Sequence, residues 1–408
     1  MMRRQARYTR RVSPLERLSL AVHEAHDYQV VLVVEGAGTI ELGALERAVA
    51  RAAAANPGIR VRLKGALTSL RWVDSGIAPV VRVIDGRGWD GTSERGAEFL
   101  REGLDPLRGG PIADVSVIHD PGPRSRLIFR GHHAAVDGRG LIHWVRDTFR
   151  ALRGERLLGS GASVTDHDIR EEYRARVVDP ATPPPIDAIP IIPPGDQLTD
   201  DLGHRWRRVV IPRHSPRMLV ETALFLAQWA RRREPGKVVF RVPVDYRGLR
   251  TSVESVGNLI GYLQLVVDEG DTHRSLTRQL TQRLRDHEDC RPLPDLDALR
   301  WRPVRLNARR VRRRLAAGLH SPRAPSGGLV SMGHFDLTEA DIPEMGFRAE
   351  LAYGLPPPIG KMNVIIADYA DHCVVVISVP ASFDRAGELD ELVEAYRTHF
   401  SGEPAPGV

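Results

Sequence analysis

The stretch that decides the fold runs Arg126-Leu127-Ile128-Phe129-Arg130-Gly131-His132-His133-Ala134-Ala135-Val136-Asp137-Gly138. Its first residues form an apolar run that predicts a strand. Leu141, Val145, Phe149 and Leu152 follow at the three- and four-residue spacing of an amphipathic helix. The sequence therefore predicts a tight turn, carrying two histidines and an aspartate, between a strand and a helix.

The residue types in this turn suit proton transfer. A neutral imidazole accepts a proton from an amine or hydroxyl near neutral pH, and the imidazolium can then protonate a leaving group. Asp137 lies four residues after His133 and could fix the turn through a buried ion pair, which sets geometry more reliably than it adds stability.

Three other interpretations of the turn stay open. His132 and His133 could simply end a strand, or they could bind a metal with Asp137, or the motif could be a relic in an inactive binding protein. Adjacent strand residues point to opposite faces, and no further Cys/His cluster has metal-ligand spacing, so the metal interpretation has the least support.

The pattern HHxxxDG, here His132 to Gly138, resembles the signature of the condensation-domain and CoA-dependent acyltransferase superfamily, which shares the fold of chloramphenicol acetyltransferase. The resemblance implies acyl transfer from a thioester to an amine or alcohol, with His133 as general base beside His132. It implies that Asp137 is structural and pairs with an arginine, and that Gly138 leaves room beside the reaction channel. It implies no metal and no tightly bound cofactor, because the substrate is an acyl-CoA or an acyl carrier protein with a phosphopantetheine arm.

The expected partner of Asp137 comes from a second resemblance. The family's passage from a helix into a strand resembles a segment of this chain, Ala55-Asn56-Pro57-Gly58-Ile59-Arg60-Val61-Arg62. In this comparison the family's arginine falls on Arg60. Arg62 is the alternative, because alternating side chains would place both arginines on one strand face.

Two further segments are similar to parts of the family that approach its active-site tunnel. The family's second-half strand resembles residues 242–247 of this chain. The Gly-Asn turn that follows it in the family resembles Val256-Gly257-Asn258-Leu259. Asn258 either hydrogen-bonds a substrate or satisfies its turn, as asparagine often does. Ser331-Met332-Gly333 weakly resembles the family's crossover segment, which makes Ser331 the other tunnel candidate.

Composition limits the class of protein. With 42% hydrophobic and 27% charged residues, the 408-residue chain is typical of a globular protein. No apolar run approaches the roughly 18 residues of a membrane span, and the basic N-terminus lacks the apolar core of a signal peptide. Two widely spaced cysteines make a disulfide framework improbable and favour a cytoplasmic location.

The net charge of +6, carried mostly by arginine, favours anionic substrates or an acidic partner. The densest basic segment, residues 302–314, predicts either a solvated helix with Val304, Leu306, Val311 and Leu315 turned inward, or a docking face for a carrier protein or CoA phosphates. Nucleic acid is not expected as a partner, because no aromatic residues interleave with these arginines.

The element pattern divides the chain into an N-terminal lobe of residues 1–178, a proline-rich crossing of residues 179–199 and a C-terminal lobe of residues 200–408. An ordered surface loop packed against one lobe is the alternative for the crossing. Strands are expected at residues 28–34, 59–63, 70–73, 80–84, 113–118, 126–129, 238–242, 329–335, 363–369 and 373–379. Helices are expected at residues 41–55 and 93–104, from Ser215-Pro216 to residue 230, and at residues 385–400.

We therefore expect an α/β protein of two chloramphenicol-acetyltransferase-like lobes arranged as a V, with a tunnel between them. The chain holds no carrier or adenylation domain, so a freestanding acyltransferase of secondary-metabolite or lipid biosynthesis is expected. Two alternatives are a non-catalytic docking protein of the same fold and a thioester hydrolase that uses the same histidine.

Overall fold

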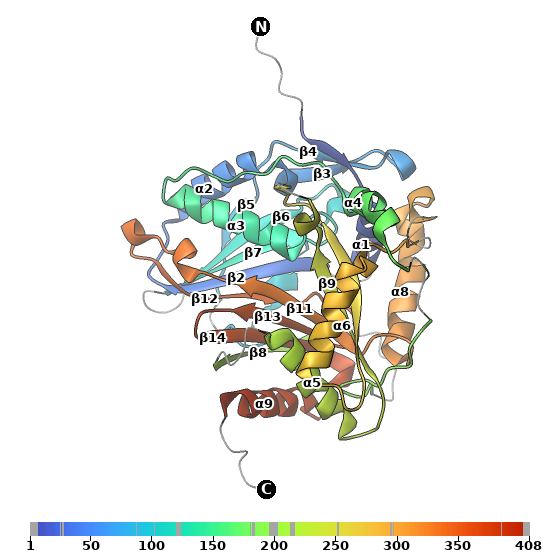
Figure 1. Ribbon diagram of the computed structural model, residues 1–408. Coiled ribbons are helices and arrows are strands. Elements are labelled where there is room, and N and C mark those ends of the chain that lie inside the picture. The colour runs from blue at the N-terminus through green and yellow to red at the C-terminus, as the bar shows by residue number, and fades with distance from the viewer. Residues whose placement is uncertain are drawn as a thin grey trace.

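The computed structural model describes residues 7–24, 26, 28–86, 88–101, 103–119, 124–179, 181, 184–195, 203–212, 217–250, 253–293, 296, 298–384 and 386–402. It is a mixed α/β structure with two sheet-containing lobes (Figure 1), which confirms the predicted fold class. A small third sheet, in the order β1-β4-β3, lies at the N-terminal end of the chain. Its strands are β1 (Thr9–Arg11), β4 (Arg71–Asp74) and β3 (Val61–Lys64).

The first lobe contains a five-stranded sheet in the order β12-β2-β7-β6-β5. Its strands are β12 (Arg348–Leu355), β2 (Gln29–Ala37), β7 (Arg124–His132), β6 (Ala113–His119) and β5 (Val80–Val83). Helices α2 (Leu42–Ala55) and α3 (Gly138–Leu152) pack on each other and on this sheet. The helix predicted for residues 41–55 is thus confirmed, with Glu41 as its N-cap and Asn56-Pro57 at its end.

The second lobe contains a six-stranded sheet in the order β10-β9-β11-β13-β14-β8. Its strands are β10 (Ile260–Val267), β9 (Val238–Asp245), β11 (Gly327–His334), β13 (Asn363–Asp368), β14 (His372–Pro380) and β8 (His204–Pro212). Three helices cover one face of this sheet (Figure 1) and bury one continuous apolar core with it. They are α5 (Met218–Arg231), α6 (His273–Arg285) and α9 (Glu388–Ser401).

The two sheets bury a second apolar layer between them. Val33 of β2 and Ile128 of β7 lie in one cluster with Val374 and Val376 of β14, while neighbouring residues of β2 and β7 face the helices of the first lobe. These strands are therefore buried on both faces, which explains why they are apolar throughout rather than alternating.

One strand crosses between the two halves of the sequence. β12 comes from the C-terminal half and pairs antiparallel with β2 from Val31 to Ala37. The domain boundary predicted at residues 179–199 stays a prediction. The two sheets do not separate the chain at this boundary, because β12 follows it in sequence and β2 precedes it. Within the crossing, Ile191 and Ile192 are buried in the core of the second lobe, and the Ala188 nitrogen donates to the Pro322 carbonyl at 2.7 Å. This part of the crossing is an ordered segment packed on one lobe.

One predicted element is wrong, and two others begin later than expected. The described residues of the range 93–104 form no α-helix, because Gly96 adopts a left-handed φ of 79° and only a short 3-10 turn follows at Glu98–Arg101. The strand expected at residues 59–63 begins at Val61, after a 3-10 turn over Pro57–Arg60. The helix expected from Ser215 begins at Met218 in the described part of the chain, and its predicted cap lies outside the described residues.

Three helices complete the surroundings of the site: α1 (Pro14–His23), α4 (Asp166–Tyr173) and α8 (Val304–His320). Helix α8 packs against α1 at one side of the molecule (Figure 1). Of the residues expected to face inward from α8, Val311 is buried, whereas Leu306 is 75% exposed. The inward face of this helix is therefore narrower than its apolar spacing predicted.

Candidate active site

The HHxxxDG motif occupies the junction that the sequence predicts. Strand β7 ends at His132, a turn follows, and α3 begins at Gly138. The backbone nitrogens of Ala135 and Val136 both donate to the His132 carbonyl, at 2.8 and 3.1 Å. These bonds close the turn and place His133 at its first position, beyond the end of the sheet.

His133 is half-buried and lies face to face with a tyrosine. Its backbone nitrogen donates to the Tyr28 carbonyl at 3.0 Å, and its ring stacks on the Tyr28 ring with centroids 4.7 Å apart and planes 16° apart. Burial lowers the pKa of His133 below its ordinary value, against the opposing effects of its own backbone carbonyl and of the Asp137 charge. The neutral imidazole, the form a general base requires, is therefore favoured at neutral pH.

His132 has a different environment. Its ring is fully buried, and its Nδ1 accepts a hydrogen bond from the Ala134 backbone nitrogen at 3.1 Å. The ring also makes an edge-to-face contact with the His23 ring, with the two ring centroids 4.6 Å apart. Burial also lowers the pKa of His132, well below the ordinary value. A neutral ring bonded inside the turn acts on the shape of the turn, so we place His132 among the positioning residues.

The arginine that pairs with Asp137 is Arg247, which corrects the expected partners Arg60 and Arg62. The Arg247 guanidinium lies 3.0 Å from Asp137 Oδ2 and also donates to Asp245 and to the backbone carbonyls of Ser255 and Gly257. Asp137 is 1% exposed and also accepts from the backbone nitrogens of Gly140 and Leu259, both at 2.7 Å.

Arg60 belongs to another ion pair. Its guanidinium makes two hydrogen bonds to the carboxylate of Asp74, at 2.8 and 3.1 Å. Because Arg60 ends a 3-10 turn and Arg62 lies in β3, the two side chains do not share one strand face. The resemblance that suggested Arg60 gave no information on Arg247, which lies 110 residues from Asp137.

The loop before β10 holds the motif from the side of the second lobe. Asn258 Nδ2 donates to the His133 carbonyl at 2.7 Å, and Gly257 forms an isolated antiparallel bridge with Val136. Asn258 is buried, and its side chain bonds the backbone of a distant turn rather than its own, while its role toward a substrate stays a prediction. Through this loop and Arg247, the second lobe fixes the backbone of His133.

Two predicted site residues lie at open positions. A Cβ on Gly138 would meet no atom within 4 Å, so this glycine borders free space, as a residue beside a channel must. Ser331 is an exposed residue of β11, and its hydroxyl accepts from the Gly333 nitrogen at 3.2 Å. Among the described residues, Ser331 makes no hydrogen bond to the motif.

Sequence reasoning missed Arg10, which also holds the backbone of the motif. Its guanidinium donates to the Ala135 carbonyl at 2.9 Å and pairs with Glu16, and both side chains are buried. Glu16 belongs to a capping box with Ser13 at the start of α1. The Ser13-x-x-Glu16 spacing was the available signal for the helix start, although not for the arginine.

Gly140 provides a test of how closely the two lobes meet at the motif. An alanine at most helix positions is more stable than glycine by about 0.5–1 kcal/mol, but a Cβ here would lie 2.2 Å from the Val256 carbonyl oxygen. Gly140→Ala is therefore expected to destabilise the fold by about 1–3 kcal/mol, the usual cost of overpacking. Urea unfolding measures this, with Gly138→Ala in the same helical turn as the matched control. An equal response of the two variants would contradict the close approach.

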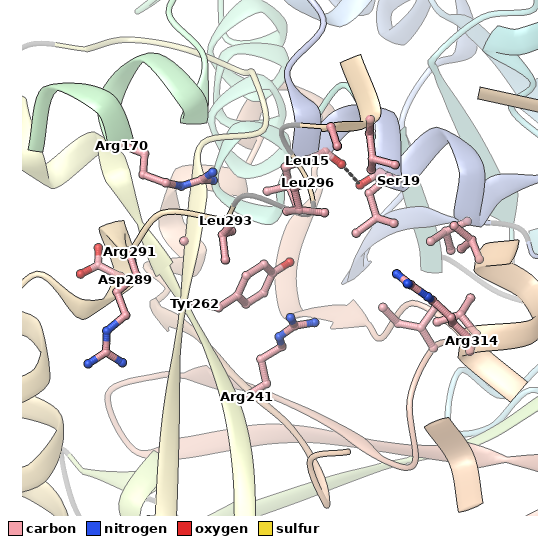
Figure 2. Close-up of a pocket in the computed structure, with 18 of the residues that line it drawn as sticks. Leu15, Ser19, Arg170, Arg241, Tyr262, Asp289, Arg291, Leu293, Leu296 and Arg314 are labelled. Carbon is pink, nitrogen blue, oxygen red and sulfur yellow. Dashed lines mark hydrogen bonds between the residues drawn. The ribbon is translucent and has the colours of Figure 1, made fainter. Parts of the chain in front are cut away.

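A cavity of about 710 Å³ lies next to the motif and is lined by residues of both halves of the chain (Figure 2). Tyr28 both lines this cavity and stacks on His133. Leu15 and Ser19 line it from α1, Arg241 and Tyr262 from β9 and β10, and Arg314 from α8. The volume is within the roughly 300–1,000 Å³ of small-molecule sites.

Within the described part of the chain, no group of three or more His, Cys, Asp or Glu residues is arranged to hold a metal ion. The same residues include no helix with the length and apolar composition of a membrane span. Cys290 and Cys373 are both buried as free thiols.

No protein-family model and no curated protein sequence matches this chain. Solved structures match it over nearly its full length. The first condensation domain of the calcium-dependent antibiotic synthetase, in complex with substrate analogue 2a, aligns with a TM-score of 0.67 and 16% identity over 98% of each chain. A variant of the starter condensation domain of rhizomide synthetase, in complex with C8-CoA, aligns with a TM-score of 0.65 and 15% identity over 97% of this chain and 95% of that one.

The condensation domain of the Monacolin K polyketide synthase aligns with a TM-score of 0.64 and 11% identity over 97% of each chain. An epimerization domain from tyrocidine synthetase B aligns with a TM-score of 0.58. The chain therefore has the fold of condensation and epimerization domains, which the HHxxxDG resemblance predicted.

Proposed function

We propose that this protein is an acyltransferase that joins an acyl thioester to an amine or alcohol, with His133 as general base. The observation that carries the proposal is the position of His133. It is a histidine with a lowered pKa at the junction of β7 and α3, stacked on a tyrosine that lines a cavity shared by both lobes. The condensation-domain fold supports the same reaction class, and the C8-CoA complex of one structural neighbour supports a CoA or carrier-protein thioester as donor.

In the proposed reaction, the acceptor nitrogen or oxygen attacks the thioester carbonyl while His133 accepts its proton. The tetrahedral intermediate then breaks its C–S bond, and the imidazolium returns the proton to the departing thiolate. The product is an amide or ester and a free thiol, so no external oxidant or reductant is consumed. Holding both substrates against one base supplies much of the rate by alignment.

The test is thioester turnover on a panel of acyl-CoA and acyl-pantetheine donors with pooled amines and alcohols, read by mass spectrometry for wild type and His133→Ala. An ester or amide that requires the acceptor and disappears in the variant supports acyl transfer. Free acid released without acceptor would instead establish a thioester hydrolase. A third outcome is that no donor is turned over, while cells that carry His133→Ala still make the product of the biosynthetic pathway to which the protein belongs. That outcome would establish a docking protein.

The pH dependence of turnover follows from the lowered pKa of His133. The base must be neutral, so kcat/KM is expected to fall on acidification with a midpoint below 6.5, the ordinary histidine value. The midpoint is expected below the ordinary value because burial disfavours the imidazolium and so lowers the pKa of His133. Initial rates at fixed donor concentration between pH 4.5 and 8 measure it, with circular dichroism at each pH to verify folding. A midpoint above 6.5 would contradict the burial argument.

A further inference from the structure

The cavity beside the motif carries an excess of positive charge. Two acidic side chains line it, Glu288 and Asp289, against seven arginines. These are Arg170, Arg241, Arg283, Arg291, Arg302, Arg310 and Arg314. Concave sites with charges of one sign focus the electrostatic field and concentrate ligands of the opposite sign.

Three of these arginines are already neutralised. Arg170 pairs with Asp166 at 2.8 Å, and Arg283 and Arg291 share Glu288 at 2.9 and 3.0 Å. In the ranges that the structure describes, no acidic side chain lies within ion-pair distance of the other four. Their charge is thus available to a ligand.

Figure 2 labels two of these four arginines, Arg241 and Arg314. Arg241 extends from β9, with its guanidinium carbon 4.4 Å from the centre of the Tyr262 ring. Arg314 extends from α8, and both guanidinium groups project into the cavity in Figure 2. Stacking on a ring orients a guanidinium while leaving its N–H groups free to donate.

One side of α8 lines the cavity, and only some of the arginines of this helix lie on that side. Four residues of α8 line the cavity at three- and four-residue spacing, so they form one face of the helix. They are Asn307, Arg310, Val311 and Arg314. Arg310 and Arg314 are exposed residues, as are Arg309 and Arg313, but the latter two do not line the cavity. The basic segment therefore presents part of its charge to the cavity, which favours the docking face over the solvated helix among the two interpretations of its sequence.

We propose that this cavity binds the thioester substrate through an anionic group, which Arg241 and Arg314 hold by charge-assisted hydrogen bonds. This inference rests on the proposed function for the identity of the ligand as a thioester. The anion is a carboxylate at the far end of the acyl chain or a phosphate of the pantetheine arm, because both accept paired N–H donors of a guanidinium. Apolar side chains line the same cavity, Leu293 and Leu296 among them, and suit the chain that precedes the anion.

Calorimetric binding to unreactive thioether analogues tests the proposal without requiring turnover. Four probes are needed: S-(3-carboxypropyl)pantetheine, its methyl ester, and the corresponding two thioethers of CoA. We expect the carboxylate to bind at least tenfold more tightly than the ester, or the CoA pair at least tenfold more tightly than the pantetheine pair. The first result identifies the acyl carboxylate as the anion, and the second identifies the phosphates.

The double variant Arg241→Met/Arg314→Met should reduce either preference to less than twofold. Neither arginine has an ion-pair partner within the described ranges, so their loss strands no buried charge, and an unchanged melting temperature verifies folding. Arg313→Met removes the same charge from the outer face of α8 and should keep the preference. Equal binding of all four probes, or equal losses in the double variant and Arg313→Met, would overturn the anion site.

The two proposals fail separately. Turnover that depends on His133 but shows no preference for an anionic probe overturns the anion site and leaves acyl transfer in place. A tenfold preference lost in the double variant, with no thioester turned over, supports the anion site and overturns acyl transfer.

Discussion

Replacing Arg247 by methionine is expected to lower the free energy of unfolding by about 3–5 kcal/mol, the usual cost of removing one partner of a buried ion pair. The Asp137 carboxylate is 1% exposed and would lose its guanidinium partner while remaining bonded to the Gly140 and Leu259 nitrogens. The carbonyls of Ser255 and Gly257 would also lose a donor. Urea unfolding of the wild type and the variant measures the difference.

The matched control is Arg60→Met, because Arg60 was the partner expected from sequence. This variant breaks a partly exposed pair with Asp74, so a smaller loss of about 1–2 kcal/mol is expected. A double-mutant cycle with Asp137→Asn decides between the two arginines. Coupling of Asp137 to Arg60 rather than to Arg247 would show that the assignment of the ion pair is wrong.

The second large effect is on catalysis. His133→Ala is expected to reduce kcat by about 10²–10⁴-fold, the range that a positioned general base contributes. Its effect on stability should be small, because the half-buried ring loses mainly the stack on Tyr28, worth about 0.5–1.5 kcal/mol. Single-turnover product formation with a saturating donor separates chemistry from binding.

His132→Ala provides the contrast within the same motif. The His132 ring is fully buried and bonds the Ala134 nitrogen, so its removal should destabilise the fold more than the loss of His133 does. A kcat for His133→Ala within tenfold of wild type would refute the role of general base. In that case alignment of the substrates alone would account for turnover.

Much of the fold near the motif could be predicted from local patterns. The apolar run of β7, the turn and the helix from Gly138 were predicted in place, because each depends on residues within a few positions of one another. Asp137 is also the N-cap of α3, a local role that its side chain performs alongside the ion pair. The helix expected at residues 93–104 failed because one glycine with positive φ outweighs the apolar spacing around it.

The sequence by itself determined the strand–turn–helix that carries His133, and its resemblance to known motifs indicated the fold. Only the tertiary structure decided which arginine meets Asp137, which loop bonds the His133 backbone, and that β12 joins the sheet of the first lobe. Only the tertiary structure, too, showed which arginines of α8 line the cavity and which do not. The physical reason is distance along the chain. Local elements follow from periodicity and capping, whereas contacts across about a hundred residues depend on how the two sheets pack.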